Sequence, residues 1–162
     1  MRLRVNEALA LPLIVSPMPK VIREVALSLT ALPRLDGETA RSIARPLTSE
    51  DRPLVEAFRA GSPDDYLHQE MHPFIGMVLD GRLLSLAHCA RRTAQVCELG
   101  IDTLPEARHR GYALAATVVW TQMILQEGRI PLYSAEASNT ASLRLAAAAG
   151  YRVFARGAAF EA

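Results

Sequence analysis

The residues best suited to chemistry by type and spacing lie in EARHRGYALAA, residues 106–116. Arg108 and Arg110 flank His109, Gly111 follows at once, and an alanine-rich run of helical character begins there. The first turn of a helix leaves backbone N–H groups without partners and carries the positive end of the helix dipole. Two guanidinium groups add charge, and a glycine removes the side chain that would hold a ligand off the backbone. The stretch therefore predicts a helix start that binds a phosphate.

The anion is expected to be a small ligand rather than a polyanion. The stretch lacks the lysine and glycine spacing of a Walker loop, and its single glycine does not make a dinucleotide fingerprint. The 162-residue chain carries 18 basic and 17 acidic residues, for a formal net charge of +1. Because this balance gives no general attraction to nucleic acid or to an anionic membrane, we expect neither as a partner.

Hydrophobic patterning around this stretch predicts the elements that position it. The segment TAQVCELGIDTL, residues 93–104, is expected to form a strand that leads directly into the helix. Asp80-Gly81, between two apolar runs, is a strong hairpin signal, and Thr48 followed by Asp51 is a good N-cap. We expect a mixed α/β sheet with a helix at 48–61, strands at 74–79, 82–91 and 93–104, a helix at 111–126, a strand at 131–137, a helix at 139–149 and a strand at 151–156.

The N-terminal part of the chain carries the weakest signals. Its apolar positions have a mixed period and several prolines divide it, so we treat 1–43 as an extension packed on or beside a domain at 44–162. Arg2 and Arg4 before an apolar run resemble a signal peptide, but Glu7 interrupts that run. No segment has the roughly 20 apolar residues of a membrane helix. We expect a cytoplasmic protein.

Cysteine and histidine usage favours neither a disulfide framework nor a metal site. Cys89 and Cys97 are the only cysteines and are expected to be reduced core thiols. His68 and His72 are four residues apart, but their spacing does not form His-Glu-x-x-His and no third ligand is apparent. We therefore expect no metal.

The pattern Arg108-x-x-Gly111-x-Ala113 after a strand resembles the acetyl-CoA motif of the GNAT superfamily of N-acetyltransferases. A second stretch, NTASLRLAAAAGY at 139–151, is similar to the family's next segment, and TSEDRPLVEAF at 48–58 is similar to its first helix. The resemblance covers 44–156 and is strongest to a poorly characterised branch. It implies an α/β fold with a mostly antiparallel central sheet, helices on both faces and a splayed parallel strand pair that binds CoA.

The resemblance also implies where acetyl-CoA binds. Its diphosphate would lie on the N–H groups at the helix start, its pantetheine arm would follow the open edge of the strand GIDT, and Asn139 would reach it from the next helix. An unpaired strand edge is suited to a ligand that completes the ladder. The expected cofactor-binding residues are Ile101, Asp102, Thr103, Arg108, His109, Arg110, Gly111, Tyr112, Ala113, Asn139 and Ser142.

Acetyl transfer from a thioester to an amine needs a base for the amine, a donor for the carbonyl oxygen and a proton for the leaving thiolate. Glu98, upstream on the same strand, is the expected base; the alternative is a solvent-facing residue or a structural ion pair. Many relatives carry a tyrosine where this chain has Ala146, so Tyr133 and Tyr112 become candidate acids or packing aromatics. Tyr66 and His68 are candidates for the acceptor pocket.

Two functions remain open at this stage. The first is an acetyl-CoA-dependent N-acetyltransferase for a primary amine of a small or amino-acid-like molecule. The second, suggested by Ala146, is a CoA- or acyl-CoA-binding protein without efficient turnover, acting as a sensor or accessory module. Either is compatible with a homodimer.

Overall fold

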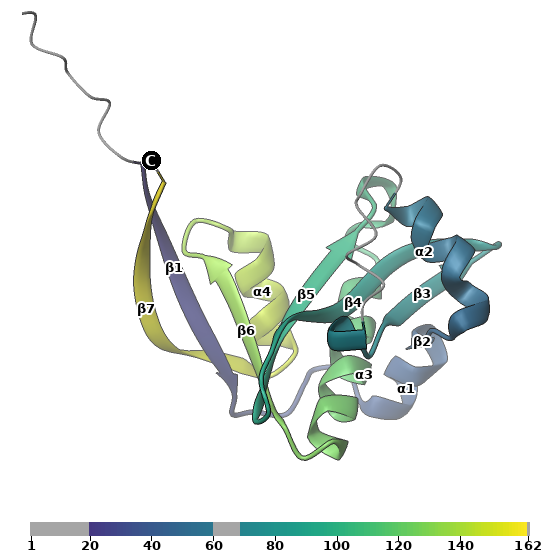
Figure 1. Ribbon diagram of the computed structural model, residues 1–162, viewed down its shortest axis with the longest axis horizontal. Helices are drawn as coiled ribbons and strands as arrows, with labels where there is room; N and C mark the ends of the chain where they lie inside the picture. Colours follow the sequence, from purple (N-terminus) through teal and green to yellow (C-terminus); the bar gives the residue numbers. More distant parts are fainter. Residues whose placement is uncertain (1–19, 60–68, 162) are drawn as a thin grey trace, which may run out of the picture.

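A single mixed β-sheet organises the molecule in the computed structural model, which describes residues 20–59 and 69–161 (Figure 1). Within these described residues, its seven strands lie in the order β2-β3-β4-β5-β6-β1-β7, and only β5 and β6 are parallel neighbours. This confirms the expected mixed, mostly antiparallel sheet. The strands are β1 (Lys20–Leu29), β2 (Arg45–Pro46), β3 (Ile75–Leu79), β4 (Arg82–Arg92), β5 (Val96–Thr103), β6 (Ile130–Glu136) and β7 (Tyr151–Glu161).

The predicted hairpin at Asp80-Gly81 is confirmed. Both residues have positive φ, 51° for Asp80 and 71° for Gly81, as the favoured two-residue hairpin turn requires. The turn joins β3 to β4, and β4 continues into β5 as an antiparallel pair. β5, the last of these three strands, leads directly into the stretch predicted to bind a phosphate.

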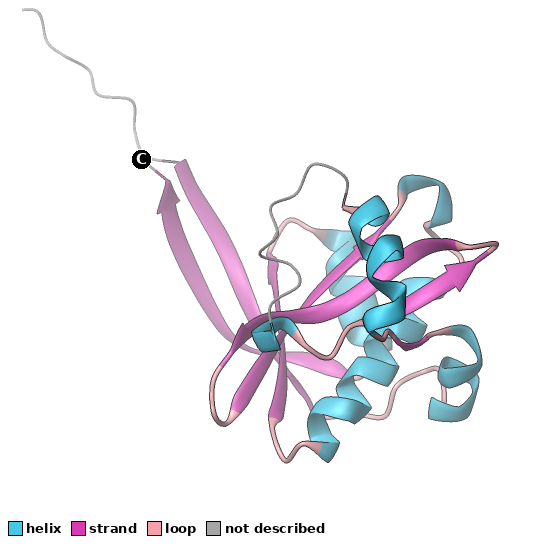
Figure 2. Cartoon of the chain, turned by 45° about the vertical axis from the view of Figure 1, so that its right-hand side comes forward, coloured by secondary structure: helices cyan, strands magenta, loops and turns pink. Residues whose placement is uncertain are grey.

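Helices cover both faces of the sheet, as expected (Figure 2). Apolar side chains of α1, α3 and α4 form one large core cluster with the strands, centred on the fully buried Trp120 and Ile124. A smaller cluster joins α2 to the opposite face through Val55, Phe74 and Leu86. The helices are α1 (Gly37–Ile43), α2 (Arg52–Phe58), α3 (Tyr112–Gln126) and α4 (Thr140–Ala148), with short 3-10 turns η1 (Ser49–Asp51), η3 (Gln69–Met71) and η4 (Pro105–Ala107). None of the helices described is long and apolar enough to cross a membrane.

The N-terminal part of the chain, whose role the sequence left open, contributes an inner strand. β1 lies between β6 and β7 and pairs antiparallel with both. Val25 and Leu27 point into the main core and are each 3% exposed, which is the period-two alternation of a half-buried strand. α1 packs against α3 through the same core. Residues 20–43 are therefore part of the packed α/β unit.

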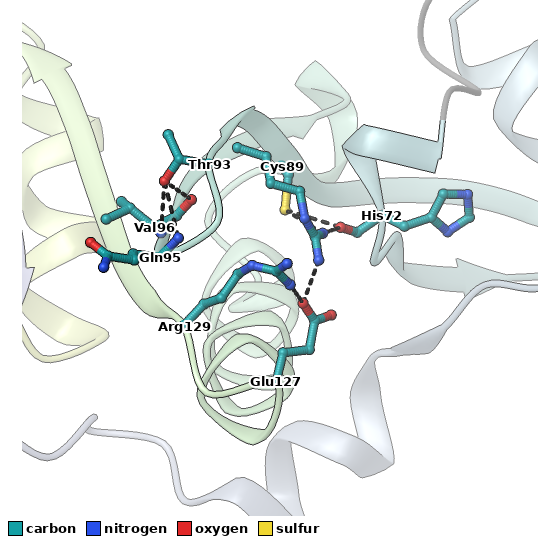
Figure 3. A network of polar contacts seen from close by, with 8 residues as sticks. His72, Cys89, Thr93, Gln95, Val96, Glu127 and Arg129 are labelled. Atoms are coloured by element: carbon teal, nitrogen blue, oxygen red, sulfur yellow. Dashed lines mark hydrogen bonds and ion pairs between the residues drawn. The ribbon is translucent and has the colours of Figure 1, made fainter.

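The polar network in Figure 3 joins the C-terminal end of α3 to the sheet. Glu127 accepts from Arg92 at 2.5 Å and from Arg129 at 2.5 Å, and Arg92 also donates to the carbonyl of His72. Cys89, a free buried thiol like Cys97, donates to the same carbonyl at 3.1 Å. Burial raises the pKa of Cys89 to about 12, so this thiol is protonated at neutral pH.

The predicted cap of Thr48 with Asp51 closes η1, the 3-10 turn that runs directly into α2. Asp51 accepts from the backbone N–H of Thr48 at 2.9 Å and forms a two-bond ion pair with Arg45 at 2.7 and 2.8 Å. The pKa of Asp51 is strongly lowered, first by the Arg45 hydrogen bonds and then by the Thr48 amide. The carboxylate thus links the end of β2 to the helix that borders the cavity described below.

Asp51→Asn is expected to lower the free energy of unfolding at pH 7 by about 1–3 kcal/mol, because it weakens charge-assisted hydrogen bonds of a buried group. A depressed pKa stabilises the fold above the unfolded-state pKa of 3.8 and loses that effect as pH falls through the folded value. The difference between variant and wild type should therefore shrink below pH 3.8 in urea titrations. Glu56→Gln, in the exposed Arg52–Glu56 pair, is the control and should change little. A pH-independent difference would contradict the linkage.

Candidate active site

The parallel strands β5 and β6 separate after a short paired stretch. Their ladder joins Val96–Glu98 to Ile130–Leu132 and then stops, and Figure 1 shows the two arrows diverging from that point. Beyond it, β5 pairs with β4 and β6 pairs with β1. Within the described residues, the facing edges of Leu99–Thr103 and Tyr133–Glu136 have no strand between them. This is the splayed pair that the sequence led us to expect.

A cavity of about 340 Å³ occupies this divergence. It draws residues from both strands, from α4, from β4 and from the end of α2. This volume lies at the lower end of the range of small-molecule sites. The lining residues are Arg59, His88, Leu99, Gly100, Ile101, Asp102, Tyr133, Ser134 and Ser142.

The predicted phosphate-binding stretch forms the beginning of α3 at the end of β5. Gly111 is the N-cap with φ 80°, and His109 also has positive φ, at 60°. In the part of the chain that the structure describes, the first amide of α3 that donates to a carbonyl is that of Ala115, to Gly111 at 3.0 Å. The preceding amides, including those of Tyr112 and Ala113, are available to an anion, and a Cβ at Gly111 would meet nothing within 4 Å.

The two arginines of this stretch are exposed, as is His109. Arg108 and Arg110 therefore provide charge at the surface around the amides. Tyr112 is half-buried and packs with Met77, Leu84 and Ala107. Because the Tyr112 ring is used in this packing, only the backbone N–H of Tyr112 is placed to contact an anion.

The expected pantetheine residues lie between the helix start and the cavity. Ile101 and Asp102 line the cavity. The hydroxyl of Thr103 lies 2.8 Å from the hydroxyl of Ser85, which also donates to the carbonyl of Asp102 at 3.2 Å. These contacts attach one edge of β5 to β4. The other edge, which faces β6, is left without a neighbouring strand at these positions over the ranges described.

The second predicted segment faces the same cavity from α4. Asn139 is the N-cap of the helix, and its side-chain oxygen accepts from the N–H of Ser142 at 3.0 Å. The hydroxyl of Ser142 lies 2.8 Å from that of Tyr133. Ala146 is fully buried and supplies no polar atom. Ser142 therefore lines the cavity on the side opposite β5, whereas Asn139 is not one of the lining residues and adjoins the cavity through its bond to Ser142.

Glu98 lies at the last paired position of the parallel ladder, opposite Leu132. Arg91 donates to it through two bonds of 2.8 and 3.0 Å, and Ser134 donates to Oε1. Burial by itself raises the pKa of Glu98, but the hydrogen bonds from Arg91 and Ser134 outweigh it, so the net pKa is lowered. The residue is an ion-pair partner of Arg91, and it reaches the cavity through Ser134, which lines it.

Five cavity residues were absent from the residues named for the predicted site: Arg59, His88, Leu99, Gly100 and Ser134. The His88 ring lies against Gly100, where a Cβ would come within 2.3 Å of Cε1. A guanidinium has no acceptor, so Arg59 donates to His88 Nε2 at 3.2 Å. Arg59 also binds Asp102 at 2.5 Å. Desolvation lowers the pKa of His88, so the ring is neutral at pH 7.

One sequence signal for this cluster was present. An isolated glycine within a strand often marks a close approach by another group, and Gly100 accommodates the imidazole. Nothing local connected it to His88 or to Arg59, which is 43 residues from its partner Asp102. Tyr66 and His68, the predicted acceptor-pocket residues, lie outside the described residues. Over the described ranges, no three His, Cys, Asp or Glu side chains gather as a metal site.

These features define an α/β protein in which a splayed parallel strand pair leads to a helix start with unused backbone amides. The family model described as GNAT acetyltransferase matches residues 31–156. The chain belongs to this family, and the family and the fold together support an acyltransferase. A comparison with curated protein sequences finds no match.

Solved structures of other proteins share the fold. A GNAT-family protein from Novosphingobium aromaticivorans superposes with a TM-score of 0.71 at 23% identity, covering 92% of this chain and 69% of that one. An acetyltransferase from the GNAT family of Colwellia psychrerythraea gives 0.68 at 20% identity, covering 89% and 57%. An N-acetyltransferase-like protein from Streptococcus suis gives 0.67 at 16% identity, covering 89% and 62%. The chain thus spans between 57% and 69% of the length of these structures.

Proposed function

We propose that this protein is an acetyl-CoA-dependent N-acetyltransferase that acts on a primary amine of a small or amino-acid-like molecule. One observation carries the proposal: the open edge of β5 runs from a cavity lined by polar groups to the unused amides at the start of α3. A ligand with an anionic end, an amide-bearing arm and a reactive end matches this sequence of environments.

The residues present fit acetyl-CoA. The amides at 111–113 and the charges of Arg108 and Arg110 would hold its diphosphate. The edge of β5 at 101–103 would pair with the amides of the pantetheine arm, and Asn139 and Ser142 would face that arm from α4. Acetyl-CoA supplies the activated acetyl group as a thioester, and it is a substrate rather than a resident cofactor.

The base would act through a hydroxyl relay. Ser134 lines the cavity and donates its proton to Glu98, so its lone pairs can accept a proton from the attacking amine. That proton passes from the amine nitrogen to Ser134 while the Ser134 proton passes to Glu98. Glu98 is then a positioning and proton-accepting group behind Ser134. A backbone N–H of β5 near Ile101 would stabilise the carbonyl oxygen.

The acceptor would enter on the side of the cleft formed by Arg59, His88 and Asp102. Arg59 is 17% exposed and Asp102 is 53% exposed at the side chain, so this ion pair presents both signs of charge. An amine that also bears a carboxylate is complementary to both members, which is why we favour an amino-acid-like acceptor.

Thiol release from acetyl-CoA, measured with a panel of primary amines and amino acids, tests the function. We expect amine-dependent release of CoA together with formation of the acetylated amine by mass spectrometry. The fully buried Ala146 favours one alternative, a CoA-binding protein without turnover. Saturable CoA binding by calorimetry with no amine-dependent release would support that alternative, and absence of CoA binding would exclude both.

A further inference from the structure

We propose that Tyr133, paired with Ser142, is the acid that protonates the thiolate leaving group. The inference rests on the proposed acetyltransferase function and names a residue for a step that Ala146 cannot perform. It assigns the proton donor to β6, across the cleft from the pantetheine-binding edge.

Position in the sheet places Tyr133 where a thioester would be attacked. It follows Leu132, the last residue of β6 paired with β5, so it stands at the closed end of the divergence. Both Tyr133 and Ser142 line the cavity, and their hydroxyls lie 2.8 Å apart. The Tyr133 side chain is held by the core, with its ring centroid 5.7 Å from that of Tyr151.

The protonation state of Tyr133 suits an acid. Burial raises the pKa of its phenol, and the Ser142 hydrogen bond lowers it by less, so the net pKa lies above the usual 10.0. The group therefore carries its proton at neutral pH. Ser142 accepts from this phenol or donates to it, and its half-exposed position gives a route for the proton to be replaced from solvent.

Other described phenols do not meet these conditions. Tyr133 and Tyr151 are both buried, at 2% and 0% exposed, but the Tyr151 hydroxyl lies 2.7 Å from that of Thr121. Tyr112 packs with Met77, Leu84 and Ala107. Neither lines the cavity. Among the described residues, Tyr133 is thus the tyrosine that combines a bound proton with access to the cleft.

Acetyl transfer along this route conserves protons and electron pairs. The amine nitrogen forms a bond to the carbonyl carbon, and the tetrahedral species collapses with cleavage of the carbon–sulfur bond. The electron pair of that bond goes to sulfur, which takes the proton of the Tyr133 hydroxyl. The phenolate regains a proton from Ser142, whose own proton is replaced from water. The amine proton leaves through Ser134 and Glu98, so the net products are the amide and the free thiol.

Paired variants of the full chain test the assignment. Tyr133→Phe is expected to lower kcat about 100-fold, the usual scale of acid catalysis, with an unchanged dissociation constant for CoA by calorimetry. Tyr151→Phe is the matched control, because it removes the hydroxyl of an adjacent buried tyrosine that also has one hydroxyl partner. Tyr151→Phe should lower the melting temperature by a similar amount and leave kcat unchanged. Equal kcat values for the two variants would overturn the proposal.

Replacing Tyr133 with difluorotyrosine tests whether its hydroxyl acts as an acid or has only a structural role, because the phenol of difluorotyrosine is more acidic. The high-pH limb of the kcat profile should move to lower pH, while CoA binding and folding are retained. The groups facing Tyr133 are Ser142 and Tyr151, with Arg59, His88 and Asp102 also lining the cavity. None of these changes in the variant, so an unmoved limb would overturn the proposal. Wild type without thiol release for every amine would instead overturn the proposed function, and the acid step with it.

Discussion

Gly111→Val is expected to weaken CoA binding about 10- to 100-fold or more, because a side chain at the start of α3 would displace the diphosphate from one or two amides. Each charge-assisted hydrogen bond contributes about 1.5–3 kcal/mol, and 1.4 kcal/mol is tenfold in affinity. The measurement is calorimetric titration with CoA. Affinity equal to that of wild type would show that the diphosphate does not lie on these amides.

Gly111 has φ 80°, so valine there also strains the backbone and lowers stability. Gly128, just beyond the other end of α3, is the matched control. Its φ is 74° and a Cβ there likewise meets nothing within 4 Å. Gly128→Val should therefore cost similar stability without changing CoA affinity. A Gly111→Asn variant adds a further test, since asparagine tolerates positive φ and still places atoms over the amides.

Glu98→Gln is expected to lower kcat about 100-fold while CoA affinity stays the same, because glutamine keeps the shape of the side chain but cannot take the relayed proton. The glutamine amide nitrogen cannot accept from Arg91, so one of the two bonds of that pair is also lost. The lowered pKa of Glu98 means that the carboxylate is ionised throughout the neutral range. The acid limb that it imposes on kcat should therefore lie below pH 4.5 in the wild type. The measurement is a pH profile of thiol release with saturating amine.

A carboxylate outside the cleft provides the control for this change. Glu127 also binds arginines, Arg92 and Arg129, and lies at the far end of α3 (Figure 3). Glu127→Gln should leave kcat and its pH dependence unchanged. If Glu98→Gln behaves in the same way, the residue is a structural partner of Arg91 and water removes the amine proton.

The position of β1 bears on how the fold is completed. This strand supplies the neighbour that β6 needs on the side away from the cleft, and β7 pairs with β1 rather than with β6. Pairing with residues 20–29 therefore holds β6 in the sheet while its edge toward β5 stays open. These residues precede the stretch that resembles the family. The chain spans 57% to 69% of the superposed structures, so the whole-protein activity of those structures does not transfer to it.

Short-range patterns were sufficient for most individual elements. Asp80-Gly81 specified a hairpin because positive φ at both positions selects the turn. Thr48 with Asp51 specified a helix start because the side chain of each accepts a hydrogen bond from the backbone N–H of the other. Gly111 and the alanine-rich run specified the start of α3 in the same way. Each of these signals is complete within a few consecutive residues.

Other features depended on residues distant in sequence. The period of residues 19–32 was mixed, and β1 pairs with β6 and β7, which come from the other end of the chain. The ion pair of Glu98 with Arg91 and the contact of His88 with Gly100 depend on the register of β4 against β5, which includes a shift between Cys89 and Arg91. Local φ, capping and periodicity are encoded along the chain, whereas strand order, register and the side chains that meet in the cleft arise from packing across the whole sheet.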